Sequence, residues 1–307
     1  MGIFDSLIVA YLFLGGTGGG ALVVLSLLEV LNAPCVAVRR WLLPSEFFAR
    51  AWSACAVALG LSVVCLLADL GRIDRAFSLF SSSSFSPVAV GAWALAAACV
   101  IAAAFALANI LEMWDLRAKL AVPAGAAGTL VGMAVITYTG VLLAGLPSID
   151  AWQTPLVPAL FVLSGVSCGV ALCLGAWAFV ECRAPLMGPF VALSRADSVV
   201  VALEAACLLA YVAWLLASSD TSQAAWALLA GDLRWPFWAG LVVCGLGIPL
   251  VLERLLTFEN RRNQLLWVAL FVLVGGITLR YLVVGISAFD ATQTTNLAGM
   301  LAVPQGV

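Results

Sequence analysis

Long apolar stretches recur along the entire chain, and this recurrence limits its fold more than any other feature of the sequence. A helix that crosses a membrane needs about 20 consecutive, mainly apolar residues. Eight such stretches are bounded by charges, prolines or Ser/Gly clusters, and they cover residues 7–31, 47–70, 87–111, 120–144, 154–180, 198–217, 236–252 and 265–288. Because 64% of the residues are hydrophobic and only 10% are charged, we predict an all-α integral membrane protein with eight transmembrane helices.

The connections between these stretches are too short to hold a folded soluble domain. An even number of spans permits two four-helix bundles. The predicted divisions are a first bundle in residues 1–150, a second bundle in residues 151–288 and a C-terminal tail in residues 289–307. The seventh span is short, and its Gly245, Gly247 and Pro249 predict a kink.

Lysine and arginine are distributed unevenly between the two sides of the predicted bundle. Ten of the 14 follow spans one, three, five and seven, whereas the opposite side carries only Arg72, Arg75 and Arg234. Short cytoplasmic loops carry the excess of positive charge in membrane proteins. We therefore predict that both termini, and with them the C-terminal tail, lie outside the cytoplasm.

The composition also excludes several kinds of redox centre. The chain has no histidine, which excludes haem ligation through imidazole, the usual His-containing zinc sites and a His general base. Most of the nine cysteines lie within spans, and none are spaced as C-x-x-C, so we interpret them as small apolar fillers. We expect no haem, iron–sulfur cluster or metal in this chain, and any such centre must belong to another subunit.

A glycine run, Gly15-Gly16-Thr17-Gly18-Gly19-Gly20, lies inside the first span. A dinucleotide-binding glycine motif follows a strand and opens a helix, so this setting argues against phosphate binding. Glycines four residues apart recur here and at Gly128/Gly132 and Gly165/Gly169, which favours close packing of helices. Room for a flat ligand between the helices is the second interpretation.

Polar and aromatic side chains gather near the outer membrane boundary. At about 1.5 Å per residue, Tyr11, Trp93 and Tyr138 lie about 6, 9 and 10 Å inside that boundary, with Asp69 and Arg72 at the mouth. Taken singly, the aromatic residues fit the belt found at membrane interfaces. Taken together, groups from four helices predict a pocket for an amphipathic ligand whose head reaches the aqueous edge.

Two charged residues lie deeper in the predicted spans. Arg280 is about 12 Å from the outer end of span eight, and Glu204 is about as far from the inner end of span six. In a core about 30 Å thick their axial separation is about 6 Å. Intramembrane ionisable residues are functional candidates. The two residues could form a structural ion pair or part of a proton path that Tyr281 and Glu29 extend, and the sequence does not decide between these interpretations.

Several motifs now carry a family resemblance, through their order and spacing along nearly the whole chain. They are Tyr11-Leu12-Phe13-Leu14-Gly15-Gly16, Asp69-Leu70-Gly71-Arg72, Ser86-Pro87 before Gly91-Ala92-Trp93, Tyr138-Thr139-Gly140-Val141-Leu142-Leu143, Trp152-Gln153-Thr154-Pro155 before Ser164-Gly165, and Leu279-Arg280-Tyr281-Leu282-Val283-Val284-Gly285. Together they resemble the NrfD/PsrC family, the integral-membrane quinone-reacting subunits of polysulfide reductase-like respiratory complexes.

The resemblance implies a location in a bacterial or archaeal cytoplasmic membrane and a fold of two four-helix bundles without haem. It implies that the first bundle binds menaquinone or another quinone near the outer face. It also implies electron exchange with a ferredoxin-like iron–sulfur subunit, which commonly serves a molybdopterin catalytic subunit. Membrane lipid is the remaining partner, and no nucleic acid is expected.

The resemblance also assigns residues. The quinone-site tyrosine of the family falls on Tyr138, and Asp69, Arg72 and Trp93 match recurrent positions near that site. Better-known members have histidine and asparagine where this chain has Tyr11 and Ile8. The Tyr11 hydroxyl could replace the hydrogen bond of the histidine, whereas no atom of the Ile8 side chain could replace that of the asparagine.

We therefore predict a membrane anchor subunit that oxidises menaquinol, or reduces a quinone. Tyr138 would bind one carbonyl of the ring, and Tyr11 or Asp69 the other. Asp69 would also accept a proton, and Arg72 would stabilise charge at the site or bind the partner. The alternatives are a secondary transporter with a midplane site at Glu204 and Arg280, and a passive anchor.

Overall fold

A computed structural model describes residues 3–33, 43–70, 87–180, 188–218, 221–255 and 262–289 of the chain. Within these ranges the secondary structure is helical throughout, without a strand. The long helices are α1 (Ile3–Asn32), α2 (Ser45–Leu70), α4 (Pro87–Ile110), α5 (Trp114–Ala144), α6 (Leu156–Ala178), α7 (Gly188–Ala217) and α10 (Arg262–Ile286). The shorter elements are η1 (Asp150–Trp152), α8 (Ser222–Leu229), η2 (Pro236–Gly247), α9 (Ile248–Leu255) and η3 (Ser287–Phe289). The prediction of an all-α protein is confirmed.

In the part of the chain that the structure describes, seven helices are long and apolar enough to cross a membrane. They overlap seven of the eight predicted spans, although α7 begins at Gly188 and not at residue 198 as predicted. The chain is therefore a multi-pass helical membrane protein. At the predicted seventh span the apolar helix covers only Pro236–Leu252. It consists of η2, a π-helix, followed by α9.

The irregularity of this short span has a cause in its sequence. Pro249 has no backbone N–H to donate, so it interrupts the regular α-helical ladder. The N–H of Ile248 instead reaches back five residues to the carbonyl of Val243. Gly245 lies backbone to backbone against Gly275 of α10, which a larger residue would prevent. The expected break therefore takes the form of a π-helical segment rather than a simple kink.

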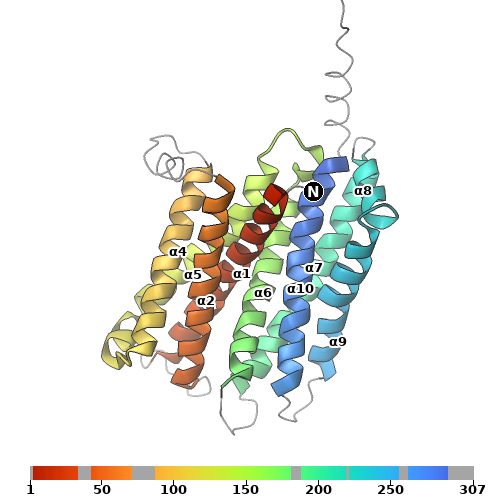
Figure 1. Cartoon of the computed structure of the whole chain (residues 1–307). Coiled ribbons are helices and arrows are strands. Elements are labelled where there is room, and N and C mark those ends of the chain that lie inside the picture. Colours follow the sequence, from red (N-terminus) through yellow and green to blue (C-terminus); the bar gives the residue numbers. More distant parts are fainter. Residues whose placement is uncertain are drawn as a thin grey trace, which may run out of the picture.

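The helices stand side by side in one bundle, with the start of α1 and the end of α10 at the same end (Figure 1). Helix α1 packs against α2, α5, α6 and α10, and α6 packs in turn against α5, α7 and α10. In the most apolar stretch of α1, 72% of the residues are buried, and in that of α6 61% are buried, compared with 28% in α2. Helices α1 and α6 therefore form the centre of the molecule.

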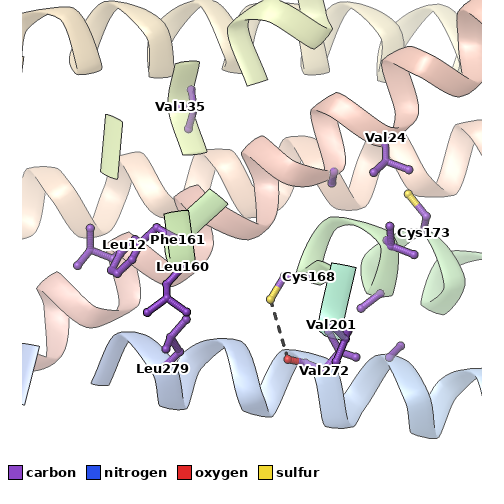
Figure 2. Packing of buried hydrophobic residues seen from close by; sticks show 14 of the residues in the cluster. Leu12, Val24, Val135, Leu160, Phe161, Cys168, Cys173, Val201, Val272 and Leu279 are labelled. Atoms are coloured by element: carbon purple, nitrogen blue, oxygen red, sulfur yellow. Dashed lines mark hydrogen bonds between the residues drawn. The ribbon is translucent and has the colours of Figure 1, made fainter. Parts of the chain in front are cut away.

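The glycine run of α1 explains how one helix can have so many close neighbours. A Cβ atom on Gly18 would lie 2.7 Å from the side chain of Leu59 in α2, and one on Gly19 would lie 3.0 Å from Val135 in α5. Gly20 lies directly against the carbonyl of Gly165 in α6. Figure 2 shows the apolar packing that results, with Leu12, Leu160, Phe161 and Leu279 meeting between α1, α6 and α10. The packing interpretation of the glycines is confirmed.

Candidate functional site

Two tyrosines from different helices meet near the end of the bundle at which α1 begins. The side chains of Tyr11 in α1 and Tyr138 in α5 are hydrogen-bonded to each other. Each hydroxyl has one hydrogen to donate, so one O–H joins the pair and the other is left for a third group. Tyr11 is only 6% exposed, whereas Tyr138 is half-buried. Tyr138 is thus the member of the pair that an incoming ligand can reach.

Two neighbouring helices hold this pair in place. The hydroxyl of Ser62 in α2 donates to the carbonyl of Tyr11 at 3.3 Å, and Gly15 leaves the space that Ser62 occupies. On the other side, the ring of Tyr138 lies directly over Gly91 of α4. Helices α1, α2, α4 and α5 each contribute one residue, and we call Tyr11, Ser62, Gly91 and Tyr138 the tyrosine site.

The other residues predicted for this site lie in different places. Asp69 is half-buried at the end of α2, seven residues after Ser62, which puts it on the same face of the helix about 10 Å nearer the end. Trp93 is 59% exposed and, two residues after Gly91, lies on the opposite side of α4. Arg72 lies outside the described residues. Ile8 packs against the hydrophobic core.

The end of α5 and the start of α6, which η1 connects, enclose an open depression of about 340 Å³. Its lining residues are Ala144, Gly145, Pro147, Gln153, Thr154 and Pro155. The segment between the two helices is firmly held, because Trp152 Nε1 donates to the carbonyl of Val283 at 2.8 Å and the Tyr211 hydroxyl donates to that of Ala151 at 3.0 Å. The depression begins about 9 Å beyond Tyr138 along α5.

A second group of polar residues surrounds Arg280, which is fully buried. Its Nε donates to the carbonyl of Leu12 at 3.3 Å, and its Nη1 donates to Ser164 Oγ at 2.9 Å and to the carbonyl of Gly276 at 2.8 Å. The guanidinium also lies 5.4 Å from the centre of the Phe161 ring. A Cβ atom on Gly16 would be 2.6 Å from Nη2, so only glycine leaves room for this side chain.

Glu204 of α7 approaches the same point from the other side. Its side chain is 6% exposed and is hydrogen-bonded to Ser164. The Ser164 hydroxyl therefore links the carboxyl of Glu204 to the guanidinium of Arg280. The space beside Glu204, between α6, α7, η2 and α10, has no room for a water-sized sphere. We call Ser164, Glu204 and Arg280 the arginine cluster.

Tyr281 and Glu29 do not join the arginine cluster. Tyr281 follows Arg280 and so points about 100° away around α10, where it packs against the hydrophobic core. Glu29 is buried at the other end of α1, where its carboxylate accepts a hydrogen bond of 3.0 Å from Trp52 Nε1. Thirteen residues separate Glu29 from Gly16, about 20 Å along the helix.

Three residues of these sites were missing from the predicted site. Ser62 and Ser164 are polar residues in otherwise apolar spans, a signal that is common in membrane helices and therefore weak. Gly91 stands within a motif of the resemblance but has no chemistry of its own. In the described ranges, no group of three or more Cys, Asp or Glu side chains could hold a metal ion.

Comparison with known proteins gives a family match along nearly the whole length of the protein. Residues 2–289 match the model of the family described as polysulphide reductase, NrfD. The C subunit of polysulfide reductase from Wolinella succinogenes is 26% identical over 89% of this protein and 90% of its own length. Protein NrfD of Escherichia coli strain K12 is 31% identical over 48% of this protein, and its homologue in Haemophilus influenzae is 26% identical over the same share. These two alignments each span 46% of the relative's length.

Proposed function

The chain belongs to the polysulphide reductase NrfD family, and we propose that it is the membrane subunit of a multisubunit redox complex that oxidises menaquinol or reduces another quinone. Its relative in Wolinella succinogenes is named as one subunit of a polysulfide reductase, which supports a role beside other subunits. The observation that carries the quinone assignment is the hydrogen-bonded pair of Tyr11 and Tyr138.

The chemistry of the tyrosine pair fits a quinone. A quinone carbonyl needs a hydrogen-bond donor, and a quinol hydroxyl needs an acceptor; the pair has one O–H to spare and lone pairs on both oxygens. When bound, a quinol supplies two electrons and two protons. Tyr138, the accessible member, would bind one oxygen of the ring. Tyr11 would orient Tyr138 from behind, rather than bind the opposite oxygen, because the two hydroxyls lie at one point.

Asp69 is then the candidate for the other side of the ring. It lies on the face of α2 that carries Ser62, nearer the outer end, where a carboxylate can pass a proton to water. Arg72 would stabilise charge at this mouth or bind the partner. Trp93 stays a prediction of the resemblance, and its exposed position on α4 also fits an interfacial aromatic belt.

Eight crossings and extracytoplasmic termini are part of the proposal. The start of α1 and the end of α10 lie at the same end of the bundle (Figure 1), and a chain with both ends on one side crosses an even number of times. The η2–α9 segment would supply the eighth crossing beside the seven long helices. The excess of arginine on the opposite side supports a location of both termini outside the cytoplasm.

The proposed partners follow from what the chain lacks in sequence. The sequence has no histidine and no cysteine motif for a cluster, so the chain would exchange electrons with a ferredoxin-like iron–sulfur subunit at the outer face. That subunit would in turn exchange electrons with a molybdopterin catalytic subunit. The terminal substrate would then be chosen by another subunit. The proposed setting is a bacterial or archaeal cytoplasmic membrane.

A secondary transporter is the second candidate, because the arginine cluster places two charged residues within the spans. The closed space beside Glu204 leaves no passage for a solute in this conformation. The Nε and Nη1 atoms of Arg280 already donate to two helix carbonyls and to Ser164, so they are not free to bind a solute. A proton path through Glu204 and Arg280 would need only the link at Ser164, and Tyr281 would lie outside it.

The test of the quinone site uses the intact complex and a menaquinol analogue as electron donor. We expect Tyr138→Phe to lower quinol-dependent turnover at least about tenfold, or about 1.4 kcal/mol, because the only accessible hydroxyl of the pair is lost. Asp69→Asn should lower it as well. Trp267→Phe, an exposed aromatic residue on α10, is the matched control. Unchanged turnover in both Tyr138→Phe and Asp69→Asn would refute the site, and purification without an iron–sulfur subunit would refute the complex.

A further inference from the structure

Gly91 lies on the inward face of α4, directly against the ring of Tyr138. A Cβ atom built on Gly91 would coincide with the space of three ring atoms, Cζ, Cε1 and Cε2. These atoms surround the hydroxyl-bearing end of the ring, not its attachment to the backbone. Any side chain at position 91 would therefore displace the end of Tyr138 that carries the hydroxyl.

The rest of α4 gives the Tyr138 ring no alternative surface of the same kind. Leu95 and Ala98, which follow Gly91 on the side of α4 that faces the bundle, are buried in the core. Val90 and Trp93, on the side of α4 that faces away from the bundle, are exposed. The inward face thus has a single position without a side chain at the level of the tyrosine pair. The ring occupies that gap in the surface of α4.

The position of the ring decides whether the tyrosine pair exists. Tyr11 is only 6% exposed and its ring is packed in the hydrophobic core, so the ring has no room to follow a displaced Tyr138. A hydrogen bond between two hydroxyls weakens steeply when the oxygens separate or the angle changes. A shift of the Tyr138 hydroxyl by the width of a methyl group would break the pair.

We propose that Gly91 is a positioning residue that sets the tyrosine pair of the quinone site by leaving space for the Tyr138 ring. This inference rests on the proposed function for its catalytic meaning, but not for its geometry. Gly91 touches no reacting atom itself and acts only through Tyr138.

The test compares Gly91→Ala with Gly60→Ala in the purified complex. Gly60 is a glycine of α2 in the same part of the molecule, and a Cβ atom there would meet nothing within 4 Å, so Gly60→Ala controls for a glycine substitution in a membrane helix. We expect Gly91→Ala to lower quinol-dependent turnover at least about tenfold and Gly60→Ala to change it less than about twofold. In a Tyr138→Phe background, Gly91→Ala should change turnover less than about twofold, since the hydroxyl that it displaces is already absent.

A second readout is independent of activity. The protein has four tyrosines, so tyrosine labelled with ¹³C at the phenol carbon gives few signals, which Tyr→Phe variants assign. Gly91→Ala should shift the signals of Tyr11 and Tyr138 and leave those of Tyr211 and Tyr281 in place. Gly60→Ala should shift none. If Gly91→Ala impairs assembly, the labelled protein is compared in a Tyr138→Leu background, where assembly should return because the clash is removed.

The outcomes separate this inference from the proposed function. Unshifted signals of Tyr11 and Tyr138 in Gly91→Ala overturn the positioning role. If Tyr138→Phe is impaired but Gly91→Ala has normal turnover, the positioning role is also overturned, whereas the quinone site is still supported. Normal turnover in Tyr138→Phe overturns the quinone site, while the signals still decide whether Gly91 positions the ring. Failed assembly in both the Tyr138 and the Tyr138→Leu backgrounds also overturns the inference.

Discussion

The tyrosine site and the arginine cluster lie on different sides of the same turn of α1, yet they are built in different ways. At the tyrosine site the polar groups are neutral, Tyr138 is half-buried, and one O–H of the pair is left to donate. At the arginine cluster the groups are charged, fully enclosed and joined to one another through Ser164. A site for an exchangeable ligand needs access and spare hydrogen-bonding capacity, and only the tyrosine site has both.

The arginine cluster also connects helices that are far apart in the sequence. Arg280 of α10 donates to the carbonyl of Leu12 in α1 and to Ser164 in α6, the two central helices. A charge buried in a membrane is expensive unless protein groups replace the water that it loses. Because these contacts are already made within the protein, we interpret the cluster first as a structural link between helices.

Arg280→Met should have the largest effect on stability. It removes the buried cation, leaves the carbonyl of Leu12 without its donor and leaves the buried carboxyl of Glu204 without a nearby positive charge, so we expect the free energy of unfolding to fall by about 3 kcal/mol. Denaturant unfolding of the complex in detergent measures this change. Arg234→Met, an exposed arginine beside Trp235, should change stability by less than about 0.5 kcal/mol. Equal stability of Arg280→Met and the natural protein would contradict a structural role.

Ser164→Ala should have an intermediate effect, because it removes only the hydroxyl between Arg280 and Glu204. We expect a loss of about 1–2 kcal/mol in stability, with a smaller effect on quinol turnover than that of Tyr138→Phe. Ser53→Ala is the control, since its hydroxyl bonds only to the carbonyl of Ala49 in its own helix. Combining Ser164→Ala with Glu204→Gln should be less damaging than the sum of the two. Strict additivity would show that Ser164 does not link the charges.

Trp93→Phe should have the smallest effect, although Trp93 lies at nearly the same depth as Tyr138. Its side chain is 59% exposed on the outer side of α4, so we expect stability within about 0.5 kcal/mol of the natural protein and turnover within about twofold. The quinol assay and detergent unfolding check both. A fall in turnover of more than about tenfold would show that the exposed side of α4 also contacts the ligand, as the family resemblance implies.

Helix type was largely predictable, and so was length apart from α7 and the seventh span. Apolar stretches bounded by charges predicted the helices because a membrane leaves backbone polar groups no partner other than each other. The seventh span was correctly expected to be irregular from Gly245 and Pro249. The π-helical form of η2 was not predictable, because Pro249 indicates that the α-helical ladder is interrupted but not which hydrogen-bond pattern replaces it.

The common level of Tyr11 and Tyr138 along the bundle was also predictable, but their contact was not. The constant rise of a helix placed Tyr11, Tyr138 and Trp93 in one layer, and the structure joins the first two and turns the third away. Ser62, Ser164 and Gly91 escaped prediction because their importance lies in what they touch on another helix. Gly91 shows this most clearly, since its role is the space that it leaves for Tyr138.

The sequence by itself thus determined the multi-pass membrane setting, the helical fold and the distribution of charge, because all of these follow from composition and from the geometry of a single helix. Only the tertiary structure decided which residues meet. The rotation of each helix depends on side chains interlocking across neighbours that are far apart in the sequence, as Arg280 and Leu12 are. That rotation separates an accessible pair of tyrosines from an enclosed cluster of charges.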